Sequence, residues 1–105
     1  MEIKVNAQAE QWFHEQVGLP EGQSPSIRFK SKLYGSSPLH EMLALIFEVT
    51  DPVDPVAQFT GENGWVFFVE KEDAWFFEGH NLIVEYDEEL DEPIYAYEKD
   101  GEIKR

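Results

Sequence analysis

Apolar residues recur at every second position in two long stretches of this chain, and this spacing constrains the fold more than any other feature. The apolar members are Ile27, Phe29 and Leu33 in residues 26–34, and Leu43, Leu45, Phe47 and Val49 in residues 41–49. In the first stretch the intervening positions are basic, namely Arg28, Lys30 and Lys32. Because side chains of a β-strand alternate between two faces, both stretches are predicted to be half-buried strands.

One helical pattern stands near the N-terminus. Asn6 is a good N-cap residue, and the apolar residues that follow it share one helical face: Ala9, Trp12, Phe13 and Val17. Gly18 is the expected C-cap, and residues 20–25 read as a polar loop rich in turn-forming residues. Further strands are expected at 2–5, 56–60, 65–69, 82–87 and 94–98, with a short helix at 70–78.

These segments do not alternate as strand and helix, so a doubly wound parallel sheet is not expected. The predicted fold class is α+β and mainly β. It is an antiparallel β-sandwich or open barrel of about seven short strands, with an N-terminal helix and a second short helix. Residues 1–105 are expected to form a single domain, in which residues 99–105 are a flexible polar tail.

Charge and cysteine content narrow the classes of function. The net charge is −14, from 22 acids against 8 bases, so most of the surface would repel nucleic acid or an anionic membrane. The chain has no cysteine, which rules out disulfides and thiolate chemistry and fits a cytoplasmic protein. No apolar signal segment opens the sequence, and no apolar run is long enough to span a bilayer.

A set of short motifs runs in order through nearly the whole chain. They are Asn6-Ala7-Gln8-Ala9, Ser26-Ile27-Arg28-Phe29, Tyr34-Gly35-Ser36-Ser37-Pro38-Leu39-His40, Phe77-Glu78-Gly79-His80-Asn81-Leu82-Ile83-Val84 and Tyr86-Asp87-Glu88-Glu89-Leu90-Asp91-Glu92-Pro93. Together they resemble the HesB-like family, the A-type carriers of iron–sulfur cluster assembly. The resemblance is closer to a cysteine-free, YneR-like branch found in Gram-positive bacteria, and it implies a HesB-like fold for residues 1–105.

The resemblance also implies where a cluster would be held. The family uses one cysteine after the glycine of the first loop and a Cys-Gly-Cys motif near the C-terminus. Here Ser36 stands at the first position, and Asp100 and Glu102 stand about where the second motif falls. Iron–sulfur clusters need soft thiolate ligands, so no cofactor is expected. The resemblance therefore implies a non-catalytic accessory or interaction protein with a partner from the iron–sulfur assembly machinery, and leaves a homo-oligomer open.

The residues themselves suggest two chemical alternatives. Imidazole and carboxylate suit non-haem iron, so His40, His80, Asp100 and Glu102 are candidate ligands, and a metal- or small-ligand-binding protein is the alternative function. Ser36, Ser37 and His40 place a hydroxyl near a base, but no orienting acid or oxyanion hole accompanies them. We therefore expect a Ser–Pro turn there and no enzyme.

Three other features have both a structural and a binding interpretation. The acids of residues 87–92 are expected to form a charged hairpin. The bases Arg28, Lys30 and Lys32 are expected to pair with the chain's own acids, with a docking site for an acidic partner as the alternative. The aromatic residues around Trp12, Trp65 and Trp75 exceed what one small core needs, and an exposed remainder would indicate a binding or self-association surface.

Overall fold

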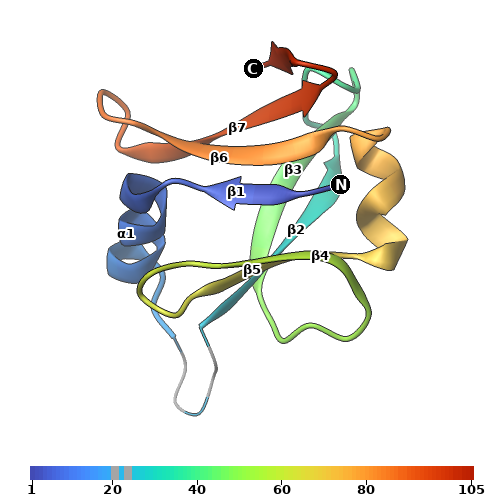
Figure 1. Ribbon diagram of the computed structural model, residues 1–105. Helices are drawn as coiled ribbons and strands as arrows, with labels where there is room; N and C mark the ends of the chain where they lie inside the picture. The colour runs from blue at the N-terminus through green and yellow to red at the C-terminus, as the bar shows by residue number, and fades with distance from the viewer. Residues whose placement is uncertain (20–21, 23–24) are drawn as a thin grey trace.

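The structure is a computed structural model that describes residues 1–19, 22 and 25–105, so the loop predicted at 20–25 lies mostly outside the described residues. The described part contains eight strands, one α-helix and one 3₁₀-helix (Figure 1). The elements are β1 (Ile3–Val5), α1 (Ala7–Gln16), β2 (Ser26–Leu33), β3 (Leu43–Val49), β4 (Pro55–Thr60), β5 (Val66–Glu70), η1 (Lys71–Phe77), β6 (Asn81–Asp87), β7 (Glu92–Lys99) and β8 (Glu102–Lys104).

The strands form two four-stranded sheets that do not close into a barrel. The first sheet has the order β1-β6-β7-β8 and the second has the order β3-β2-β5-β4. The predicted α+β, mainly β class is confirmed, but the sheets are mixed, since β1 pairs in parallel with β6 and β2 pairs in parallel with β5. Parallel neighbours need a long connection, and each of these pairs is separated by several intervening elements.

The core lies between the two sheets and α1 (Figure 1). The helix contributes Ala9 and Phe13, and the ring of Phe13 makes edge contacts with Phe29, Phe47 and Phe67 from the second sheet. Edge-to-face pairs of this kind add to the free energy gained by burying the rings. The first sheet contributes Leu82, Val84 and Tyr97 to the same cluster.

Both ends of α1 follow from local chemistry. The side-chain oxygen of Asn6 accepts the N–H of Ala9 at 2.8 Å, which confirms the predicted N-cap. The C-cap is Val17 rather than Gly18, because the N–H of Val17 still donates to the carbonyl of Phe13 and the backbone then turns extended. Neither helix of the described residues has the length and apolar character needed to cross a lipid bilayer.

The polar C-terminus differs from the expected tail. Asp100 and Gly101 both have positive φ and form a tight turn, after which β8 pairs with β7 in antiparallel register. The guanidinium of Arg105 then donates to both carboxylate oxygens of Glu85, at 2.8 and 3.1 Å. That bond is the main reason that the pKa of Glu85 is lowered. Backbone pairing with β7 and an ion pair therefore hold this segment. Neither interaction requires a regular spacing of apolar residues.

Candidate functional site

Three of the candidate metal ligands share one open pocket of about 520 Å³. His80, Asp100 and Glu102 line it together with Glu78, and two cations, Lys99 and Lys104, line it as well. His40 lies outside the lining, with its Nε2 atom 4.0 Å from the Glu78 carboxylate. The structure thus brings together most of the candidate metal ligands, in a pocket where two lysines offset much of the charge of three carboxylates.

The imidazoles also have other partners. Nδ1 of the buried His80 lies 2.8 Å from the carbonyl oxygen of Phe77, and Nε2 of His40 lies 2.8 Å from that of Phe76. A carbonyl oxygen only accepts hydrogen bonds, so these two nitrogens are the donors, and only the second nitrogen of each ring is left for another partner. Within the described residues no three His, Asp or Glu side chains are arranged to hold an ion. The candidate ligands therefore share a pocket without forming a three-ligand site in the described part of the chain, and metal binding stays a prediction.

The serines near His40 form a turn. Ser37, rather than Ser36, contacts His40: the N–H of His40 donates to the Ser37 hydroxyl oxygen at 3.1 Å, and the N–H of Ser37 donates to the His40 carbonyl at 2.9 Å. The imidazole points instead toward η1, where it packs on Phe76. The hydroxyl therefore supports the backbone and has no base positioned to activate it.

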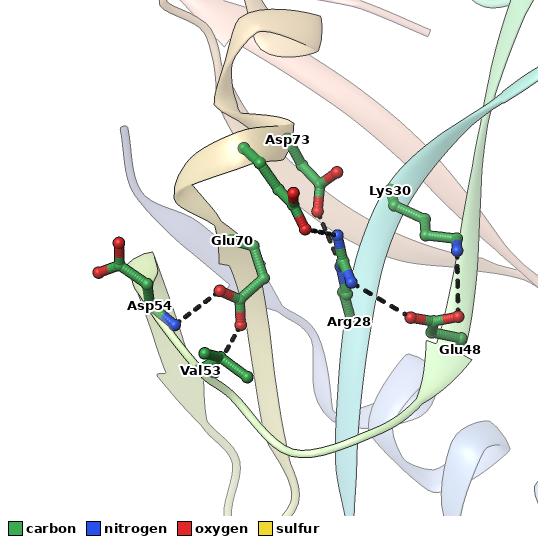
Figure 2. A network of polar contacts seen from close by, with 8 residues as sticks. Arg28, Lys30, Glu48, Val53, Asp54, Glu70 and Asp73 are labelled. Carbon is green, nitrogen blue, oxygen red and sulfur yellow. Dashed lines mark hydrogen bonds and ion pairs between the residues drawn. The ribbon is translucent and has the colours of Figure 1, made fainter.

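The basic stripe of β2 is held by the protein's own carboxylates (Figure 2). Arg28 donates to Asp73 at 2.8 Å, to Glu72 at 2.7 Å and to Glu48 at 3.4 Å. Glu48 also pairs with Lys30 at 3.1 Å. The hydrogen bond to Asp73 is the main reason that the pKa of Arg28 is raised. The prediction of internal ion pairs is confirmed for Arg28 and Lys30, which are not free for an acidic partner, whereas the described residues show no ion pair of Lys32.

The acidic run of residues 87–92 forms the β6–β7 turn. A side-chain oxygen of Asp87 accepts the backbone N–H groups of Glu89 and Leu90, at 2.9 and 3.2 Å. The predicted charged hairpin is therefore confirmed. Its tip carries Leu90, an exposed apolar side chain without a cluster of similar residues around it.

A group of exposed apolar side chains surrounds the loop between β2 and β3. We call it the Tyr34 surface, and its members are Leu33, Tyr34, Met42 and Trp75. Tyr34 is 89% exposed, and its backbone N–H donates to the carbonyl of Met42 at 3.1 Å. Trp75 comes from η1, and its ring lies 5.9 Å from the ring of His40 in the loop. The aromatic surplus noted in the sequence is thus partly exposed.

Tyr34 has a strained backbone. Its φ is +70°, in the left-handed region that residues with a side chain rarely adopt. The next residue is Gly35, and a Cβ atom there would overlap the side chain of Ala44, so the loop closes tightly against β3. Backbone strain of this kind is often found at functional sites. The strained backbone and exposed ring of Tyr34 therefore suggest a role in binding. No pattern in the sequence distinguishes Tyr34 from a core aromatic residue.

Comparison of the sequence with known proteins identifies two relatives. The chain is 32% identical over 99 residues, which is 93% of its length and 100% of the relative, to a protein of Bacillus subtilis named pyruvate dehydrogenase inhibitor. The chain belongs to the family of this inhibitor. It is also 30% identical over 97 residues to an uncharacterized protein of Staphylococcus saprophyticus, with 91% of this chain and 98% of that relative covered.

No protein-family model and no solved structure matches the chain. The names of the two relatives mention neither iron nor sulfur, so membership of the HesB-like family stays a prediction.

Proposed function

We propose that this protein is a binding protein that inhibits a pyruvate dehydrogenase. The observation that carries the proposal is the match to the Bacillus subtilis inhibitor, which spans 100% of that relative and 93% of this chain. The match is therefore not confined to one short segment of either chain. The proposal also keeps the expectation of an accessory protein that acts through a protein partner.

The exposed aromatic side chains support this proposal. A protein inhibitor needs a surface that buries apolar area against its target, and tyrosine and tryptophan are enriched among the residues that dominate such interfaces. The Tyr34 surface supplies both residue types beside a methionine. The left-handed backbone at Tyr34 costs about 1 kcal/mol or more, and a fold that keeps such strain has a use for the resulting side-chain position.

Charge favours a particular kind of target surface. The chain carries 22 acids against 8 bases, and Arg28, Lys30 and Arg105 are already paired internally. Complementary potentials raise the rate of association and suppress wrong partners. The target region should therefore be basic, and added salt should weaken inhibition.

The test is a titration of the purified protein into purified pyruvate dehydrogenase complex, with the initial rate of pyruvate oxidation as the readout. We expect a dose-dependent fall in rate, and Tyr34→Ala should raise the half-inhibitory concentration by about tenfold or more. Leu90→Ala is the matched control, since it removes another exposed apolar side chain in a turn. An unchanged rate at saturating protein would contradict the proposal.

A further inference from the structure

The loop between β3 and β4, residues 51–54, is held by a buried carboxylate (Figure 2). Glu70 is 5% exposed, and its two oxygens accept the backbone N–H groups of Val53 at 2.8 Å and Asp54 at 2.7 Å. Hydrogen bonds from backbone N–H groups to an ionised carboxylate are stronger than those to neutral acceptors. The carboxylate on β5 thus fixes two consecutive residues of a loop that comes from another part of the sheet.

Further constraints act on both sides of this clamp. The N–H of Thr50 donates to the carbonyl of Ser26, and the N–H of Lys71 donates to the carbonyl of Asp54 at 2.9 Å. Pro52 and Pro55 fix φ at two positions around the clamped residues. Ordering a flexible loop on binding costs conformational entropy. This loop is already ordered in the free protein, so binding should cost less entropy there.

The loop that the Glu70 carboxylate holds exposes one apolar side chain among acidic residues. Val53 is 90% exposed, the highest value among the large apolar residues that the structure describes. The loop forms the wall of an open pocket of about 600 Å³, which four acids (Asp51, Asp54, Glu70 and Glu72) and two bases (Arg28 and Lys71) line. Arg28 pairs with Glu72 and with Asp73. The other lining acids, Asp51, Asp54 and Glu70, outnumber the remaining base, Lys71, so the rim is acidic.

We infer that the loop of residues 51–54 is a preformed contact element that seats Val53 on an apolar patch of the target, with lysine or arginine side chains of the target entering the acidic pocket beside it. The inference rests on the proposed function and adds a second point of contact to the Tyr34 surface. The occupant is a basic surface of the target protein rather than a small anion, because the pocket rim is acidic. Glu70 is a positioning residue in this contact, since it acts through the loop backbone.

The two contact regions are linked by η1. At its start, the N–H of Lys71 donates to the carbonyl of Asp54 in the loop, and near its end Trp75 packs on His40 of the β2–β3 loop, which also carries Tyr34. In Figure 1 this short helix stands at the right of the molecule, above the β3–β4 loop. A target that spans η1 can therefore reach Trp75 and Val53 together.

The decisive variant is Val53→Lys in the inhibition titration. It removes the apolar contact and sets a cation against basic target residues, and the exposed position leaves the fold intact. We expect a rise of about tenfold or more in the half-inhibitory concentration, with an unchanged melting temperature. Leu90→Lys makes the same change at the β6–β7 turn, on the opposite side of the molecule in Figure 1, and should stay within about twofold of wild type.

A second variant tests the clamp itself. In Glu70→Gln the amide nitrogen is a donor, so it cannot accept the second backbone N–H. Amide hydrogen exchange at Val53 and Asp54 should then be about tenfold faster or more, while exchange in the β2–β3 ladder stays slow. Inhibition should weaken less than in Val53→Lys, because the apolar side chain remains.

The outcomes separate this inference from the proposed function. Wild type that inhibits, together with Val53→Lys that inhibits equally well, overturns the inference alone. Wild type that does not inhibit overturns the proposed function, and the inference with it. Fast exchange at Val53 and Asp54 in the wild-type protein would also overturn the inference, because the loop would not be preformed.

Discussion

Glu10 on α1 and Gly61 at the end of β4 are packed so closely that a Cβ atom at position 61 would overlap the Glu10 carboxylate. Glu10 is only 3% exposed, and its Oε2 atom accepts the backbone N–H of Asn63 at 3.1 Å. The glycine is needed for space, since its φ is not in the left-handed region. A buried acid of the helix therefore organises the β4–β5 turn.

This contact predicts a non-additive pair of substitutions. Gly61→Ala should push the carboxylate away from the Asn63 N–H and lower the free energy of unfolding by about 1–3 kcal/mol, the cost of an unsatisfied buried group. In a Glu10→Ala background the same substitution should cost much less, because the space is already empty. Urea denaturation of the two single variants and the double variant measures the coupling. If the two changes in the free energy of unfolding are additive, the coupling energy between Glu10 and Gly61 is zero and the prediction is wrong.

Strain at Tyr34 predicts a conflict between stability and binding. Asparagine tolerates the left-handed region better than tyrosine, so Tyr34→Asn should leave the free energy of unfolding unchanged or raise it by up to about 1 kcal/mol. The same variant loses the aromatic ring and should inhibit pyruvate dehydrogenase less well. Thermal denaturation and the inhibition titration together check this prediction. A marked loss of stability would mean that the ring packs on the protein itself.

Tyr86 and Asp91 predict a change at alkaline pH. The Tyr86 hydroxyl donates to the Asp91 carboxylate, and this hydrogen bond is the main cause that raises the pKa of Tyr86 to about 12. Because the folded-state pKa is raised, the contribution to stability is fully present below the ordinary pKa of 10.0 and is lost as pH rises through about 12.

In Asp91→Asn the pKa of Tyr86 should fall toward the ordinary value, which a difference titration of phenolate absorbance against wild type measures. Tyr86→Phe identifies the signal of this residue. An unchanged titration in Asp91→Asn would show that the bond does not form in solution.

The pocket beside His80 predicts a negative metal titration. Lys99 and Lys104 offset much of the charge of its three carboxylates, and no three His, Asp or Glu side chains of the described residues are arranged to hold an ion. Added Fe(II) should therefore shift the melting temperature by less than about 1 °C, since a ligand stabilises only what it binds. A clear upward shift that His80→Ala or Glu102→Ala abolishes would contradict this and would support a metal-binding function.

Local chemistry made part of the fold predictable. The period of two located β2 and β3, and Asn6 identified the start of α1. Each of these signals consists of residues that are close together in the sequence. The parallel pairing of β1 with β6 has no such local signal. Nor does β8, a polar segment with no apolar period, which pairing with β7 and the Arg105–Glu85 ion pair hold in place.

The candidate site was less predictable because its key groups break the usual rules of burial. Glu10 and Glu70 are acidic residues that the fold buries, and the sequence predicted Glu70 as the first residue of a helix rather than the end of β5. Tyr34 and Val53 are apolar residues that the fold exposes. Their positions follow from long-range backbone hydrogen bonds to Met42 and Glu70, which a pattern of neighbouring residues does not contain.

The parallel pairing of β1 with β6 has a consequence for synthesis of the chain. Residues 26–70 contain every strand of the second sheet, so that sheet can assemble on the ribosome before β6 is translated. The first strand to emerge must wait for residues 81–87, and such pairing between distant segments forms slowly. A product truncated before β6 would leave β1 without its partner, and translation must pass residue 104, the end of β8, before the protein can complete its first sheet.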